Sequence, residues 1–211
     1  MSIAVIDSGG ANLGSVLHAL GRLEAPAFLT SDPDRIRSAE RVLLPGVGSA
    51  RSAMQALDQA GLIDVIRALQ QPVMGICLGL QLLYEHSEEG DCECLGLIPG
   101  QVKHLKAGPA LRLPHMGWNQ LDWRDADDPL ARGLDSEDWF YFVHSFAAPL
   151  DHAVAVSHHG QAFAAVVRRD NFSACQFHPE KSAAAGQHLL ANFLALDVPA
   201  RRASADFRSL T

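Results

Sequence analysis

A cysteine stands between two glycines at a point where an apolar strand is expected to turn into a helix. The run is Gly75-Ile76-Cys77-Leu78-Gly79, and the apolar residues 73–76 lead into it. A sharp strand-to-helix turn exposes the side chain at its tip, and flanking glycines leave room for the bend. Because free N–H groups at a helix start favour a thiolate, the turn predicts Cys77 as a nucleophile. The alternative is a small, inert core residue, which is how most lone cysteines are used.

A histidine and a glutamate two positions apart supply the partners that such a nucleophile needs. The motif His178-Pro179-Glu180 ends an extended run, and residues two apart in extended chain face the same side. We therefore expect the Glu180 carboxylate to orient the imidazole of His178, which acts as the base toward Cys77. Taken alone, the motif would more simply be an exposed loop. Its combination with the cysteine turn favours a catalytic triad.

The other three cysteines are poorer candidates for this chemistry. Cys175 alternates with Gln176 and His178 along the extended run, so we expect it to face the core. Acidic neighbours surround Cys92 and Cys94 and disfavour their thiolates. None of these three cysteines is expected to compete with Cys77 as the nucleophile.

Acyl transfer also needs hydrogen-bond donors at the developing oxyanion. One is expected to be the backbone N–H of Leu78, directly after the nucleophile. A second has to come from another strand end. The turn Leu44-Pro45-Gly46-Val47-Gly48 is the candidate, because glycines let a backbone approach a substrate closely. Taken alone, it would count as an ordinary tight turn.

Alternating strands and helices are expected to position these residues in the first half of the chain. Apolar runs predict strands at residues 3–6, 42–44 and 73–76, and amphipathic patterns predict helices at residues 13–23, 50–69 and 78–84. Asp32 followed by Pro33 predicts the start of a further short helix. The nearly all-apolar strands indicate a parallel sheet covered on both faces, with function at its carboxyl edge.

The pattern changes after Gly90, where helices largely disappear. Strands are predicted at residues 101–105, 117–123, 139–146, 153–157, 163–168 and 172–177, and a final helix at residues 182–196. We predict a single α/β domain over residues 1–198. Its fold class is a flavodoxin-like three-layer sandwich with a central, mostly parallel sheet and antiparallel additions in the second half. The tail at residues 199–211 is expected to fray.

Composition limits the classes of partner. The chain has 211 residues, 17 basic against 24 acidic side chains and a net charge of −7, so we expect neither nucleic acid nor an anionic membrane as a ligand. Without a signal segment or a membrane span, a cytoplasmic protein with reduced cysteines is expected. The only adjacent histidines, His158-His159, lack zinc-like ligand spacing, so we expect no metal and no cofactor.

Four motifs together resemble the class I (triad) glutamine amidotransferases. They are Leu44-Pro45-Gly46-Val47-Gly48, Gly75-Ile76-Cys77-Leu78-Gly79-Leu80-Gln81, Tyr141-Phe142-Val143-His144-Ser145-Phe146 and Gln176-Phe177-His178-Pro179-Glu180-Lys181-Ser182. Their order and spacing cover the chain from Ile3 to Phe193. Within that family, the closest resemblance is to the glutaminase subunits of imidazole glycerol phosphate synthase.

The resemblance implies hydrolysis of L-glutamine to glutamate and ammonia through a Cys77 thioester, with His178, held by Glu180, shuttling the proton. It assigns the oxyanion N–H groups to Val47 and Leu78. It assigns binding of the amino-acid end of glutamine to Gly48, Gln81, Ser145 and Phe146. Phe146 stands where the family frequently has tyrosine.

The resemblance also implies a partner. In the family the glutaminase forms a heterodimer with a (β/α)8-barrel cyclase subunit, and the ammonia passes into that barrel for a step of histidine biosynthesis. The implied interface positions are Asn12, His115, Met116, Trp118, Asn119, Tyr141 and Lys181. By residue type alone, Trp118 and Tyr141 would instead belong to a strand core.

Two other functions fit parts of the pattern. A free-standing cysteine hydrolase or peptidase of the same fold would turn over without any partner. A binding module that kept the fold and lost catalysis would be expected to carry a damaged triad, whereas Cys77, His178 and Glu180 are all present.

Overall fold

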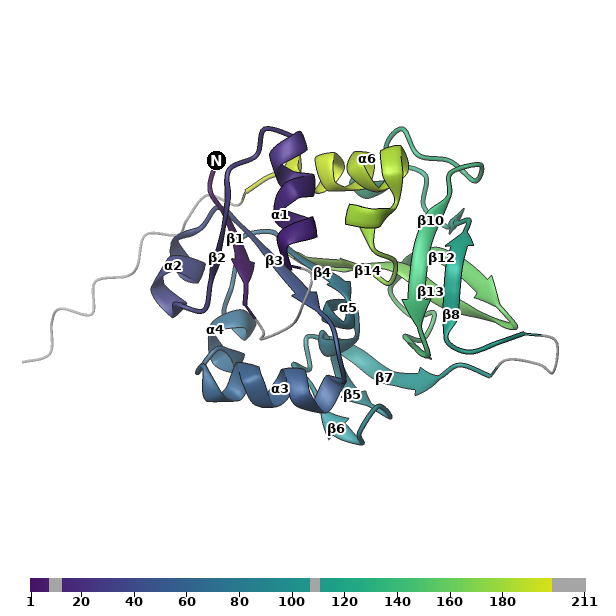
Figure 1. The fold of residues 1–211 in the computed structure, drawn as a ribbon, viewed down its shortest axis with the longest axis horizontal. Coiled ribbons are helices and arrows are strands. Elements are labelled where there is room, and N and C mark those ends of the chain that lie inside the picture. Colours follow the sequence, from purple (N-terminus) through teal and green to yellow (C-terminus); the bar gives the residue numbers. More distant parts are fainter. Residues whose placement is uncertain (8–12, 107–110, 199–211) are drawn as a thin grey trace, which may run out of the picture.

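An eight-stranded sheet in the order β2-β1-β3-β4-β14-β13-β12-β9 runs through the middle of the molecule (Figure 1). The computed structural model describes residues 1–7, 13–106 and 111–198. Five neighbouring strands are parallel: β2 (Ala27–Thr30), β1 (Ile3–Ile6), β3 (Arg41–Gly46), β4 (Val73–Cys77) and β14 (Phe172–Cys175). Three antiparallel strands extend the sheet: β13 (Gln161–Arg169), β12 (Ala153–His159) and β9 (Asp122–Trp123). The predicted fold class, a mostly parallel sheet with antiparallel additions, is confirmed.

Helices cover both faces of the sheet and form the outer layers (Figure 1). Helices α1 (Leu13–Arg22) and α6 (Ala183–Leu194) share one core with Ile3 and Val5. On the other face, a second core joins Ala4 and Ile6 to α2 (Pro33–Ser38), α3 (Ala50–Gln59), α4 (Ile63–Arg67) and α5 (Leu78–Leu82). Because successive strand residues point to opposite faces, a strand covered on both sides has to be apolar throughout.

Two smaller sheets complete the fold. One is an antiparallel pair of β8 (His115–Asn119) and β10 (Phe140–His144). The other has the order β11-β7-β5-β6 and contains β11 (Phe146–Ala147), β7 (Ile98–His104), β5 (Tyr84–Ser87) and β6 (Cys92–Glu93). Short 3-10 helices lie at η1 (Pro129–Ala131) and η2 (Pro179–Lys181). The β10-to-β11 segment thereby connects the two smaller sheets.

Several element boundaries differ from the sequence prediction. The helix predicted over residues 50–69 is wrong, because the chain turns at Gly61 with φ +65° and forms α3 and α4 instead. The helix predicted over residues 78–84 stops at Leu82, and Tyr84 begins β5. The half-exposed edge strand β2 was not predicted, since its residues lack a clear alternation. The strand predicted over residues 117–123 is split between β8 and β9.

The short helix at Pro33 is confirmed. The Asp32 side chain caps it by accepting hydrogen bonds from the N–H groups of Asp34 at 2.8 Å and Arg35 at 3.3 Å. Across the part of the chain that the structure describes, no helix combines the length and apolar character needed to cross a membrane. The predicted tail at residues 199–211 lies outside the described residues.

Candidate active site

The turn between β4 and α5 places Cys77 at its tip in a strained conformation. Its φ of 55° and ψ of −109° lie in a region that side-chain-bearing residues rarely adopt. A Cβ on Gly75 would lie 2.6 Å from the carbonyl oxygen of Gly79, and a Cβ on Gly79 would overlap the carbonyl oxygen of Leu44. Both glycines are therefore required by close packing of the turn. The predicted strand-to-helix turn is confirmed.

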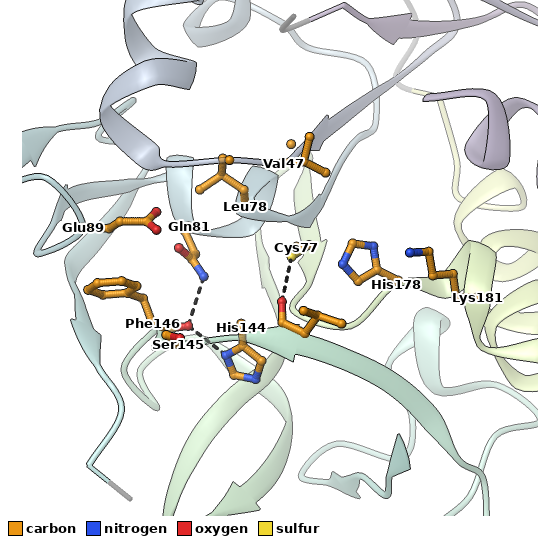
Figure 2. Close-up of a pocket in the computed structure, with 13 residues that line it drawn as sticks. Val47, Cys77, Leu78, Gln81, Glu89, His144, Ser145, Phe146, His178 and Lys181 are labelled. Atoms are coloured by element: carbon orange, nitrogen blue, oxygen red, sulfur yellow. Dashed lines mark hydrogen bonds between the residues drawn. The ribbon is translucent and has the colours of Figure 1, made fainter. Parts of the chain in front are cut away.

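The imidazole of His178 lies beside the sulfur of Cys77 (Figure 2). Its Nδ1 is 2.9 Å from Oε1 of Glu180, whose side chain is 2% exposed. The predicted pairing is thus observed, but the predicted reason for it is wrong. Residues 179–181 form the 3-10 helix η2 rather than extended chain, so the turn itself carries the carboxylate back to the ring.

The charge state of His178 follows from these neighbours. Burial favours the neutral ring, but hydrogen bonds to Cys77 and to Glu180 outweigh burial and raise the pKa of His178 to about 10. The ring therefore holds a proton at neutral pH. A protonated imidazole beside a sulfur can pair with a thiolate and later pass its proton to a leaving amine.

A cavity of about 380 Å³ opens in front of the sulfur (Figure 2). Its size suits a small polar ligand. Of the catalytic, oxyanion and substrate residues predicted from the sequence, all but Glu180 line it. The complete lining is Gly46, Val47, Gly48, Cys77, Leu78, Gln81, Glu89, Val143, His144, Ser145, Phe146, His178 and Lys181.

The two segments predicted to form an oxyanion hole meet at this cavity. Gly46 pairs with Cys77 in the parallel register of β3 and β4, which brings Val47 and Gly48 alongside the sulfur. Leu78 is the first residue of α5, where a backbone N–H has no acceptor within its own helix. Gly48 has φ +92°, a conformation that glycine adopts readily. The assignment of the two N–H groups to an oxyanion remains a prediction.

The opposite wall of the cavity is built around the carbonyl group of Phe146. This oxygen accepts hydrogen bonds from Nε2 of Gln81 at 3.0 Å and from Nδ1 of His144 at 2.8 Å (Figure 2). A carbonyl can only accept, so these two donors are fixed in orientation. The Ser145–Phe146 segment is thereby held against the cavity by side chains from two other positions.

Glu89 is a cavity residue that the sequence prediction missed. It follows β5, and its Oε2 accepts a 2.9 Å hydrogen bond from the N–H of Ala50 while the carboxylate lines the cavity. A carboxylate at this position suits a positively charged ammonium group. The sequence shows only an acidic pair at residues 88–89. The strand β5 before this pair was not predicted, and only its first residue, Tyr84, falls within the predicted helix.

The predicted interface positions differ in how exposed they are. Met116 is 64% exposed and Trp118 is 49% exposed, so the strand-core alternative is wrong for Trp118. The ring of Trp118 contacts the half-buried Tyr141 edge-on, with ring centroids 5.8 Å apart. Asn119 is half-buried and Lys181 is exposed at the cavity. His115 lies beneath this surface, 4% exposed and 3.0 Å from His144. Asn12 lies outside the described residues.

The remaining thiols behave as expected, although the main cause differs for two of them. Cys175 is fully buried, as predicted, and burial raises its pKa. For Cys92 and Cys94, burial rather than the neighbouring carboxylates is the main cause of a raised pKa, which reaches about 12 at Cys94. Within the described ranges, no cluster of three or more His, Cys, Asp or Glu side chains could hold a metal ion.

Comparison with known proteins links this site to one family of enzymes. The family model described as glutamine amidotransferase class-I matches residues 4–196. The "Imidazole glycerol phosphate synthase subunit HisH 2" of Legionella pneumophila (strain Paris) is 54% identical over 196 residues, covering 92% of this chain and 98% of that protein. The "Imidazole glycerol phosphate synthase subunit HisH" of Xanthomonas axonopodis pv. citri (strain 306) is 51% identical over 199 residues, covering 93% and 98%.

Solved structures share the fold at much lower identity. PurLQS from Thermotoga maritima superposes with a TM-score of 0.66 at 20% identity, covering 92% of this chain and 97% of that chain. The glutaminase domain of Trypanosoma brucei CTPS with bound acivicin gives a TM-score of 0.62 at 16% identity, covering 93% and 95%. At such identities the likeness concerns the fold alone.

Proposed function

We propose a function from one premise: this chain belongs to the class-I glutamine amidotransferase family. It is the glutaminase subunit of an imidazole glycerol phosphate synthase and works with a cyclase subunit in histidine biosynthesis, as relatives 51–54% identical over nearly their whole length indicate. The observation that carries the chemical assignment is the thiol, imidazole and buried carboxylate aligned at one end of the cavity.

The amino-acid end of glutamine binds along the wall formed by Gly48, Gln81, Ser145 and Phe146. Its ammonium group lies near the carboxylate of Glu89, because this acidic side chain lines that part of the cavity. Both Nε2 hydrogens of Gln81 are used by acceptors of the protein, so its carbonyl oxygen is the polar atom left for the ligand. This arrangement directs the side-chain amide of glutamine toward the sulfur.

The reaction then proceeds in two halves. The thiolate of Cys77 attacks the amide carbon of glutamine, and the resulting oxyanion is stabilised by the N–H groups of Val47 and Leu78. His178 gives its proton to the amide nitrogen, the C–N bond breaks and ammonia leaves a thioester. Water attacks the thioester, His178 takes a proton from the water, and glutamate leaves the restored thiolate. Glu180 keeps the ring oriented and stabilises its charge throughout.

The cyclase docks on the same side of the molecule. Met116 and Trp118, with the half-buried Tyr141 beside them, offer an apolar surface on the β8–β10 pair. Lys181 lines the cavity as an exposed cation. A (β/α)8-barrel cyclase covering this surface in a heterodimer receives the ammonia directly. Residues 1–198 form the single domain that performs the glutaminase half.

The decisive experiment replaces Cys77 by alanine in the complex with the cyclase subunit. We expect glutamine-dependent synthesis to disappear while synthesis from added ammonia continues at the wild-type rate. Loss of both activities would mean that Cys77 serves the fold or the assembly. The wild-type chain is measured in parallel, because full hydrolysis without the cyclase would indicate a free-standing hydrolase. No hydrolysis in any combination would indicate a silent binding module.

A further inference from the structure

Gln176 is a fully buried amide between the nucleophile and the substrate wall. It follows β14 two residues before His178, and its side chain has no exposed surface. Its Oε1 accepts a 3.1 Å hydrogen bond from Nε2 of Gln81, and its Nε2 lies 3.9 Å from Sγ of Cys77. One side chain therefore contacts two groups that the proposed reaction uses.

The neighbours of the Gln176 amide determine which of its ends is the oxygen and which is the NH2 group. The carbonyl of Phe146 can only accept, so Gln81 must turn its NH2 group toward it. The second hydrogen of that NH2 group needs an acceptor, which fixes the oxygen of Gln176 on the Gln81 side. The NH2 group of Gln176 then has to face the sulfur.

We propose that Gln176 is a positioning residue of the glutaminase site, an inference that rests on the proposed function. Its oxygen holds the Gln81 amide so that the carbonyl of Gln81 is presented to the ligand, and its NH2 group donates to the sulfur of Cys77. Figure 2 shows the consequence for Gln81, whose oxygen is turned toward the side of the cavity where Glu89 lies.

The two contacts have separable effects. Holding Gln81 affects the binding of glutamine, because a rotated amide would present hydrogens to the ammonium group and repel it. Donation to the sulfur affects the reactivity of Cys77, because a hydrogen bond to a charged form stabilises that form. A side chain that merely filled space would influence neither quantity in folded protein.

The first variant is Gln176→Met, which keeps the length of the side chain and removes both polar ends. We expect the KM for glutamine, measured in the complex with the cyclase, to rise about tenfold, the effect of losing one hydrogen bond to a charged or buried partner. Alkylation of Cys77 by iodoacetamide at neutral pH should slow by a similar factor of about ten. Ser173→Ala is the matched control. Ser173 lies on β14, the strand that precedes Gln176, and its substitution removes a buried hydrogen bond to the carbonyl of Val73 without touching the cavity.

The second variant is Gln176→Glu, which keeps an oxygen facing Gln81 in either protonation state of the carboxyl group. We expect its KM to stay within about twofold of wild type, well below that of Gln176→Met. In a Gln81→Met background, Gln176→Met should raise KM no further, since the amide that it holds is gone, while the slower alkylation should persist.

The proposal is overturned if Gln176→Met, normalised to folded protein, has wild-type KM and a wild-type alkylation rate. It is also overturned if Gln176→Glu raises KM as much as Gln176→Met, or if the KM effect persists in the Gln81→Met background. Alkylation requires no partner and no turnover. A wild-type chain without glutaminase activity in the complex with the cyclase would refute the proposed function, while the alkylation rates would still decide whether Gln176 contacts the sulfur as described.

Discussion

Replacing Glu180 by glutamine removes the negative charge that holds the imidazole of His178 and leaves the volume of the side chain at position 180 nearly constant. The native carboxylate is 2% exposed and lies 2.9 Å from Nδ1 of His178. Glutamine keeps the chain length and one oxygen, so the Glu180→Gln variant should fold and bind glutamine. We expect it to turn over much more slowly, because the protonated ring loses its only described carboxylate partner.

The magnitude follows from the strength of this contact. A buried hydrogen bond to a charged group contributes about 1.5–3 kcal/mol, which corresponds to a roughly 10- to 150-fold loss of kcat. The same contact is one of the two that raise the pKa of His178 to about 10 against the effect of burial. Removing it should therefore lower that pKa by about one to two pH units, at about 1.36 kcal/mol per unit.

The assay is the pH profile of kcat for glutamine hydrolysis in the complex with the cyclase and its ligand. For the wild type, the alkaline limb should lie near the pKa at which the ring loses its proton. For Glu180→Gln, the plateau should fall and the alkaline limb should move toward neutral pH. The control is Glu40→Gln, a half-exposed glutamate at the opposite end of β3 from the cavity. A Glu180→Gln profile with the wild-type plateau and limb would refute the role given to Glu180.

Three further predictions concern the turn, the buried histidines and the partner surface. Gly79→Ala should lower the free energy of unfolding by about 3 kcal/mol or more, because its Cβ would overlap the Leu44 carbonyl. Urea denaturation tests this, with Gly14→Ala as the control because a Cβ there meets nothing within 4 Å. Equal stability of the two variants would contradict the prediction. Burial lowers the pKa of His115 to about 4 and that of His144 to about 3, below the ordinary value of 6.5. The stability that depends on their neutral forms is therefore complete above pH 6.5 and is lost as the pH falls toward these lowered pKa values. Each histidine should contribute a loss of up to about 1.4 kcal/mol per pH unit in that window, and a flat stability profile between about pH 6.5 and 4.5 would count against it. Lys181→Ala should weaken binding to the cyclase about five- to tenfold in a calorimetric titration without changing the melting temperature, whereas unchanged affinity and unchanged stimulation would remove Lys181 from the interface.

Local sequence constraints explain why the nucleophile could be predicted. The turn at Cys77 depends on five consecutive residues, and its two glycines are needed for contacts within that turn and with the adjacent strand. The pairing of His178 with Glu180 is similarly local. Even there, the sequence indicated extended chain, while Pro179 starts a 3-10 helix that brings the carboxylate to the ring by another route.

Contacts between distant parts of the chain could not be predicted in the same way. Gln176 reaches Gln81 and Cys77 across 95 and 99 positions, and Glu89 binds the N–H of Ala50 across 39 positions. These partners are set by the order of strands in the sheet, which residue patterns alone leave open. The break at Gly61 shows a related limit, because an isolated glycine in an amphipathic pattern does not reveal that the helix ends there.

The central claim is that the sulfur of Cys77 attacks the amide carbon of glutamine. The most direct test exposes the chain, in complex with the cyclase, to an electrophilic glutamine analogue and locates the adduct by peptide mass spectrometry. We predict one adduct on the peptide that contains Cys77, formed more slowly when glutamine is present in excess. An adduct on Cys92, or an active enzyme whose Cys77 stays unlabelled, would contradict the account.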